Sequence, residues 1–187
     1  MNVANSDQIS DLSGSFRHSM SLLAGSVAVV TTVVDGRPWG MTITACCSVS
    51  AEPPTVLVSL AKNTVTAQMI EAQGEYGLCL MGAHGIETAK FAAAPGRPKF
   101  LDDAGHVIPG PASTPSVTGA IAHLDCAVST KVDVEDHVLF LGRVRAVSFP
   151  TSGSPLVYGA RQYQRIVPAL QLVGTEAEDH ALAYSAW

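Results

Sequence analysis

Two neighbouring segments carry residues that could bind a nucleotide-like ligand. Residues 40–50 (GMTITACCSVS) contain no charge and alternate hydroxyl with apolar side chains. Residues 61–66 (AKNTVT) end one expected strand and open a helix, which Asn63 or Thr64 can cap. The first N–H groups of that helix are available to an anion, and Thr66 adds a hydroxyl. A flat ring against the first segment and a phosphate at the helix start would suit flavin mononucleotide. Ordinary barrel residues and a common N-cap would explain the same pattern.

Motifs for several other chemistries are missing from the sequence. It has no G-x-x-x-x-G-K-[ST] phosphate loop, no G-x-G-x-x-G dinucleotide turn, and neither H-E-x-x-H nor paired C-x-x-C. His123 and Cys126 have H-x-x-C spacing, but residues three apart on a strand point to opposite faces, so we expect no metal site. Cys46 and Cys47 also face opposite ways, which favours buried structural thiols over a vicinal disulfide.

Composition limits the class of protein. The chain has 187 residues, 47% of them hydrophobic and only 14% charged, with a net charge of −5. The length predicts one domain, and the shortage of charge suggests that a second copy or a cofactor covers part of the surface. The acidic balance argues against a nucleic-acid partner.

The compartment can also be predicted from the sequence. The longest apolar stretch, residues 21–34, is too short and too polar to span a membrane. The polar, acidic beginning of the chain does not resemble a secretory signal, and four cysteines are too few for a disulfide scaffold. We therefore expect a cytoplasmic protein with reduced thiols.

Short strands and a few helices must position the two segments. The helical spacing of Phe16, Met20 and Leu23 predicts a helix that stops at Gly25. Asp35-Gly36 predicts a hairpin turn, and residues 95–115, rich in Pro, Gly and Asp, predict a long mobile loop. The expected strands are residues 27–34, 39–47, 55–60, 76–81, 121–131, 134–147 and 155–158, and the other expected helices are 64–72 and 86–94. About seven strands without regular alternation with helices predict a closed β-barrel with helical caps, not a doubly wound α/β sheet.

An ordered series of motifs resembles the short-chain flavin reductases, the NAD(P)H-dependent partners of two-component flavin monooxygenases. The series spans about residues 16–166 and consists of Phe16-Arg17, GSVAVVTT (25–32), GMTITACCSVS (40–50), PP (53–54), KNTVT (62–66), KFA (90–92), GAIAHLDC (119–126), EDHVLFLGRV (135–144) and PLVYGARQY (155–163). The resemblance implies a mainly β fold, an FMN-binding split β-barrel with a few short capping helices. It also implies a homodimer, FMN or FAD as flavin, NADH or NADPH as reductant, and a separate flavin-dependent monooxygenase as partner. The domain would occupy residues 16–167, between a polar leader (1–15) and a tail (168–187).

The resemblance also assigns roles to individual residues. The strand along the isoalloxazine ring would comprise Thr42, Ile43, Thr44, Ala45, Cys46, Cys47 and Ser48. The contacts to the ribityl chain and phosphate would come from Ser59, Leu60, Ala61, Lys62, Asn63 and Thr66. Phe91 would line the flavin pocket, Tyr163 would form its dimer-side wall, and His137 would lie near the nicotinamide as the candidate catalytic residue. Taken alone, Phe91 could be a core residue and His137 a histidine on the barrel rim.

Two departures from the family pattern bear on the site. Cys46-Cys47 stands where relatives commonly have a Ser-Phe type of pair, and Glu135 replaces the usual glycine before Asp136-His137. Hydride transfer from nicotinamide to flavin needs two stacked rings and little acid–base chemistry from the protein. A flavin oxidase of the pyridoxamine-phosphate oxidase type and a non-catalytic flavin-binding module remain as alternatives.

Overall fold

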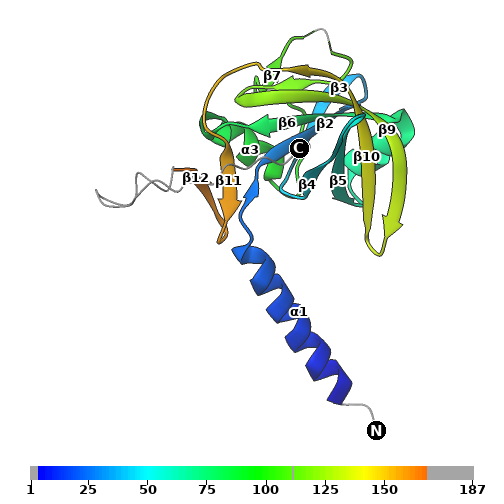
Figure 1. The fold of residues 1–187 in the computed structure, drawn as a ribbon, viewed down its shortest axis with the longest axis vertical. Helices are drawn as coiled ribbons and strands as arrows, with labels where there is room; N and C mark the ends of the chain where they lie inside the picture. Colours follow the sequence, from blue (N-terminus) through cyan, green and yellow to red (C-terminus); the bar gives the residue numbers. More distant parts are fainter. Residues whose placement is uncertain (1–3, 111, 168–187) are drawn as a thin grey trace.

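The computed structural model describes residues 4–110 and 112–167, so the expected tail, residues 168–187, lies outside the described part. The helices are α1 (Ala4–Leu22), α2 (Val65–Gln73) and α3 (Ile86–Ala93), with a 3₁₀ turn η1 (Ala83–Gly85). The strands are β1 (Gly25–Ser26), β2 (Ala28–Val34), β3 (Arg37–Ile43), β4 (Cys46–Ala51), β5 (Pro54–Ala61), β6 (Glu75–Met81), β7 (Val107–Ile108), β8 (Ser116–Val117), β9 (Ala120–Val134), β10 (His137–Ser148), β11 (Leu156–Gly159) and β12 (Gln162–Arg165). The fold is mainly β, as the sequence predicts (Figure 1).

Seven antiparallel strands form the main sheet, in the order β3-β2-β6-β9-β10-β5-β4. The two edge strands, β3 and β4, are consecutive in the chain and are joined only by Thr44 and Ala45. The edges of the sheet therefore meet at this junction, although β3 and β4 form no ladder with each other in the described residues. The result is a barrel that is split along this seam.

Strand β2 is buried on both faces and separates two hydrophobic clusters. Ala28 and Val30 pack into the barrel interior with Phe140 and Tyr76, whereas Val29 faces the second cluster. The second cluster lies between the sheet and α3, β8 and β11. Burial on both faces explains why β2 is a continuous β-branched run and not an alternating strand.

The expected single strand over residues 39–47 is wrong, because the chain forms β3 and then β4. The alternation of hydroxyl and apolar residues continues through the break, so the pattern gives no sign of it. At Thr44 and Ala45 both side chains are exposed, and the chain passes from its partner β2 to its new partner β5. The hairpin at Asp35-Gly36 is confirmed: both residues have positive φ, 50° and 74°, as a type I′ turn requires.

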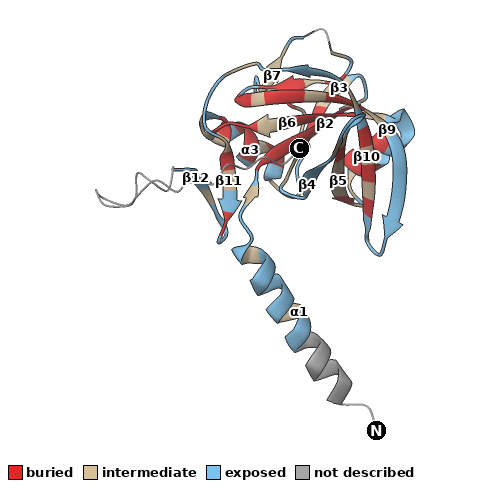
Figure 2. Ribbon diagram, viewed as in Figure 1, coloured by how far each residue is buried: buried red, intermediate tan, exposed pale blue. Residues whose placement is uncertain are grey.

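Helix α1 begins at Ala4, well before the expected start at Phe16. Figure 1 shows it projecting away from the barrel, and Figure 2 shows that its described side chains are mostly exposed. Leu12, Phe16 and Met20, spaced four residues apart, are 70%, 61% and 47% exposed. This stripe of apolar side chains has no packing partner in the described part of the chain.

Contacts anchor the segment expected to be a mobile loop. The Arg37 guanidinium pairs with Asp102 at 2.9 Å and with Asp103, and Leu101 is fully buried in the second cluster. Phe100 packs edge-on against Trp39, with ring centroids 5.1 Å apart. The segment carries little regular structure, as predicted, but these contacts tie it to β3.

Among the described helices, none combines the length and the apolar character needed to cross a membrane.

Candidate functional site

Strands β4, β5 and β10 lie side by side and gather most of the predicted site residues. The Ser59 N–H donates to the Ala45 carbonyl at 2.9 Å, and Ser59 pairs with Leu139 on the other side. Two residues further along β5, Ala61 pairs with His137. The register therefore brings the 44–48 segment, the 59–63 segment and His137 to one region, although they are distant in sequence.

Strand β4 offers an uncharged edge to this region. Its partner is β5, and its other edge carries no further strand in the described residues. Unpaired N–H and C=O groups along an edge strand can hydrogen-bond an incoming partner. Cys47 and Ser48 are exposed here, and Cys46 is half-buried against the barrel interior. An uncharged edge of this kind suits a flat ring that carries its own donors and acceptors.

The start of α2 lies at the end of β5. Thr64 caps the helix: its hydroxyl accepts from the Ala67 N–H at 3.2 Å and donates to the Ala61 carbonyl at 2.8 Å. Among the described hydrogen bonds, none is donated by the N–H groups of Val65 and Thr66. Asn63 and Lys62 are exposed beside them. This end of the helix can therefore hold an anion through backbone N–H groups, with Asn63 adjacent.

The hydroxyl of Thr66 does not lie at this surface. Thr66 is 1% exposed, and its Oγ1 accepts a hydrogen bond from the Trp39 indole Nε1 at 3.1 Å. Its expected hydroxyl contact to a phosphate is therefore not supported by the position of the side chain. Only the main chain of Thr66 faces the helix start. The sequence could not show this, because the partner Trp39 lies on a distant strand.

His137 lies beside a small group of charged residues at the β9–β10 hairpin. Its Nδ1 is 2.7 Å from the Asp136 carboxylate, and its side chain is 47% exposed. The hydrogen bond from His137 lowers the pKa of Asp136. The backbone N–H of Lys62 donates to the Asp136 carbonyl at 3.0 Å, and the Lys62 ammonium pairs with Asp133 at 3.3 Å. The hairpin is thus tied to the end of β5.

Phe91 and Tyr163 form a second group, over the other core cluster. Both side chains are partly buried against that cluster. The Thr42 hydroxyl donates to the Ala89 carbonyl of α3 at 2.7 Å, which connects the Phe91 helix to β3. Tyr163 packs edge-on against Tyr158, with centroids 5.2 Å apart, and burial raises its pKa. The described contacts do not bring this pair to His137.

The expectation of buried thiols is wrong for Cys47. All four cysteines are free, but Cys47 is exposed, whereas Cys79 and Cys126 are fully buried. Burial raises the pKa of Cys79 and Cys126 to about 12 and also raises the pKa of Cys46. The alternation of faces along β4 was predicted correctly. The outward residue faces solvent because no element covers this edge.

Two residues near Phe91 were missed in the sequence. The Arg97 guanidinium lies 4.6 Å from the Phe91 ring centroid, and the His106 ring lies 5.1 Å away on a tilted plane. Both come from the irregular 95–115 segment, where no periodicity indicates a direction for any side chain. The KFA motif (90–92) identifies Phe91 and gives no indication that the Arg97 guanidinium lies over its ring.

Comparison with known proteins agrees with this geometry. The family model described as "Flavin reductase like domain" matches residues 20–167. The chain is 35% identical to a flavin reductase (NADH) of Kitasatospora aureofaciens, over 80% of each chain. It is 32% identical to the NADH-dependent flavin reductase StyB of Pseudomonas fluorescens, over 82% of this chain and 90% of that protein.

A solved structure shows the same architecture. The flavin reductase of styrene monooxygenase (SMOB) from Pseudomonas putida S12 matches with a TM-score of 0.73 and 30% identity, over 81% of this chain and 97% of that one. The sequence, the split barrel and the extent of the match lead to one assignment: this chain belongs to the flavin reductase like domain family.

Proposed function

We propose that this protein is an NADH-dependent flavin reductase that supplies reduced flavin to a separate monooxygenase. The observation that carries the proposal is the juxtaposition of the uncharged β4 edge, the open start of α2 and the Asp136-His137 pair, within a chain of this family. Relatives named as NADH-dependent reductases, and one named as a styrene monooxygenase component, support the choice of reductant and partner.

The residues present fit a flavin. The exposed backbone edge of β4 would hold the isoalloxazine ring, with Thr42–Ser48 along it. Ser59–Asn63 would hold the ribityl chain, and the N–H groups of Val65 and Thr66 would receive the phosphate. Lys62 and Asn63 are exposed at the same place and would contact the phosphate of FMN or the diphosphate of FAD.

Bound flavin supplies the acceptor for a hydride from reduced nicotinamide. The protein must therefore bind and orient the flavin and the nicotinamide nucleotide and shield them from water, and it needs no nucleophile. Backbone N–H groups on β4 would stabilise negative charge on the ring. His137, held by Asp136, would orient the nicotinamide nucleotide through its carboxamide or phosphates, without transferring a proton.

The proposal also includes the oligomeric state of the protein and its cellular compartment. Residues 16–167 would form the reductase domain, and the protein would act as a homodimer in the cytoplasm. The unpartnered apolar stripe on α1 supports a second copy, because an isolated helix of weak helix formers is marginal in water. Four free cysteines support a reducing compartment.

NADH oxidation measured with and without added FMN or FAD tests the function. The expected result is turnover that depends on free flavin, with NADPH less effective. Titration of flavin-free protein with both flavins identifies the preferred one. An oxidase with its own organic substrate would instead need that substrate for turnover, and a carrier module would bind flavin without oxidising NADH.

A further inference from the structure

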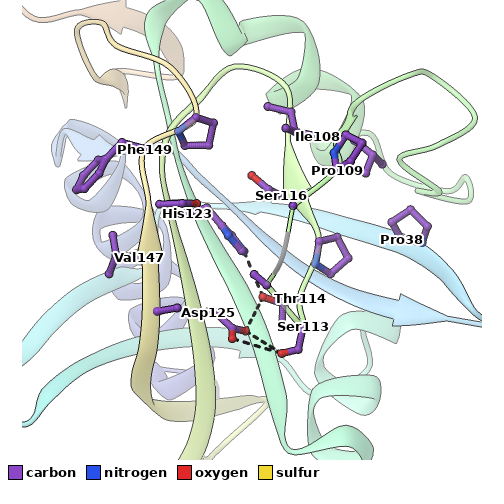
Figure 3. Close-up of a pocket in the computed structure, with 17 residues that line it drawn as sticks. Pro38, Ile108, Pro109, Ser113, Thr114, Ser116, His123, Asp125, Val147 and Phe149 are labelled. Carbon is purple, nitrogen blue, oxygen red and sulfur yellow. Dashed lines mark hydrogen bonds between the residues drawn. The ribbon is translucent and has the colours of Figure 1, made fainter.

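A cavity of about 790 Å³ lies away from the proposed flavin site (Figure 3). Residues 146–150, at and beyond the end of β10, form one wall, whereas His137 begins that strand. Residues 107–110 and 112–116 form another wall, and the β9 side chains His123 and Asp125 form the floor. None of the residues assigned to flavin or nicotinamide lines this cavity. Its size is typical of small-molecule sites, which range over about 300–1,000 Å³.

The lining is uncharged apart from one neutralised carboxylate. Among the described lining residues there is no lysine or arginine. The Asp125 carboxylate is paired at 2.9 Å with Arg145, which lies outside the lining. A phosphate group would therefore meet no free cation in this cavity. This composition argues against a nucleotide as occupant and favours a neutral molecule.

The walls are mainly apolar. They include Pro109 and Pro150, together with Ile108, Val147 and Phe149. Val147 and Phe149 are 51% and 77% exposed, so the mouth of the cavity presents large apolar side chains to solvent. Such walls suit an aromatic or alicyclic body.

The floor contains a histidine whose tautomer follows from its neighbours. The Thr114 hydroxyl donates its single proton to Asp125 at 2.8 Å. At the 3.2 Å contact between Thr114 Oγ1 and His123 Nε2, the histidine must therefore be the donor. Burial lowers the pKa of His123, which keeps the ring neutral. Nδ1 is then an acceptor, and the described hydrogen bonds supply it with no donor.

Gly77 makes room for this arrangement. A Cβ at Gly77 would clash first with Thr31 Oγ1, and it would also lie 2.9 Å from His123 Nε2 and 3.0 Å from Thr114 Oγ1. Any larger residue would displace the polar floor. The backbone of β6 is therefore adapted to hold these side chains in place.

Ser116 belongs to the same lining, but its hydroxyl is not open to the cavity. The residue is 8% exposed, and its Oγ is buried without a hydrogen-bond partner among the described residues. The Cys79 thiol lies nearby, but a thiol is a weak partner. An occupant of the cavity therefore meets the acceptor of His123 and not the Ser116 hydroxyl.

We propose that this cavity is a second binding site, for a neutral, mainly apolar molecule with an aromatic body and one hydroxyl group. The hydroxyl donates a hydrogen bond to His123 Nδ1, while the body lies against Ile108, Val147 and Phe149. The inference does not depend on the reductase activity, because it uses no residue of the flavin site.

Calorimetric titration of the full-length protein with 2-naphthol, with and without saturating FMN, tests the proposal. The expected result is binding of one naphthol per chain, unaffected by FMN. The control compound is 2-methoxynaphthalene, in which a methyl group replaces the hydroxyl proton. This compound should bind about three- to tenfold more weakly than 2-naphthol, as expected for one lost neutral hydrogen bond.

Three variants test whether the probe lies in the cavity. Ala146→Trp, at an exposed lining position, should block binding. Ser116→Ala removes a buried hydroxyl that an occupant cannot contact, so it should fold and leave naphthol affinity unchanged. Tyr76→Phe is a second control: Tyr76 Oη is also buried without a partner in the described residues and lies in the barrel interior, so its removal should leave naphthol affinity unchanged.

Absence of naphthol binding, displacement of naphthol by FMN, equal affinity for 2-methoxynaphthalene, or unchanged affinity in Ala146→Trp would each overturn the proposal. NADH oxidation by the same preparations tests the reductase function independently.

Discussion

At the scale of single residues, His137 combines exposure with a fixed orientation. Its Nδ1 is held by Asp136 at 2.7 Å, and about half of its side chain is open to solvent. The ring is therefore positioned to contact a ligand through Nε2. The sequence pattern could identify His137 only through the family resemblance, since an isolated D-H pair is uninformative. The position of His137 beside Ala61 follows from the pairing of β5 with β10, two strands that are distant in sequence.

His137→Ala should mainly raise the KM for NADH, by about five- to tenfold, because it removes a contact used in binding. Flavin affinity and kcat should change little. Steady-state kinetics with varied NADH measure KM and kcat, and a flavin titration measures flavin affinity. A hundredfold loss of kcat at normal KM would instead indicate acid–base catalysis, and no change in either parameter would make His137 a rim histidine.

Cys47 is the most accessible of the four thiols. Burial raises the pKa of Cys46, Cys79 and Cys126, which suppresses their thiolates. Iodoacetamide should therefore label Cys47 first, and bound FMN should slow that labelling if Thr42–Ser48 lies along the ring. Peptide mass spectrometry measures the site and the rate, and Cys47→Ser is the control. Equal labelling rates with and without saturating FMN would move the ring away from β4.

At the scale of elements, the sequence predicts most strands and helices to within a few residues. Apolar residues alternate along β9 and β10, and the alternating set that includes Cys126, Val138 and Phe140 is the one that packs in the barrel. The β3–β4 break and the Thr66–Trp39 hydrogen bond could not be predicted, because both depend on elements that come together only in the folded barrel. Periodicity reports which face of a strand is buried, but not which partner covers it.

The β9–β10 turn contains a residue that is ill-suited to its backbone. Glu135 has φ of 45°, whereas Asp136 is not among the residues with positive φ. This pattern belongs to turns that favour glycine at the first central position. The family pattern has glycine here, so the departure noted in the sequence has a conformational cost.

Glu135→Gly should raise the free energy of unfolding by up to about 1 kcal/mol, since glycine relieves the left-handed strain but adds unfolded-state entropy. Urea denaturation measures the change. Glu135→Ala separates charge from conformation, because it removes the carboxylate and keeps the Cβ. Equal stabilisation by both substitutions would show that charge repulsion with Asp136, and not backbone strain, is relieved.

At the scale of the whole molecule, the barrel carries an extended arm. Helix α1 stands away from the body (Figure 2). Its side chains Leu12, Phe16 and Met20, spaced four residues apart, are exposed. The low share of charged residues agrees with a surface that is partly covered. In a homodimer, this stripe would pack on the second copy.

The double variant Phe16→Glu, Met20→Glu should shift the protein from twice the 19.5 kDa chain mass to the single-chain mass. Light scattering coupled to size-exclusion chromatography measures the mass. Ser15→Glu with Ser19→Glu adds the same charge next to the stripe and should leave the dimer intact. Dimers in both variants would show that α1 does not form the interface, and a monomeric unmodified protein would contradict the homodimer itself.

The central claim is that this chain passes hydride from NADH to flavin. The most direct measurement mixes the protein with FMN or FAD and NADH under anaerobic conditions and follows flavin absorbance. The account predicts that one NADH is consumed for each flavin reduced, and that deuterium at the transferred C4 position of NADH slows the reduction. Flavin that stays oxidised in the presence of protein and NADH would contradict the account.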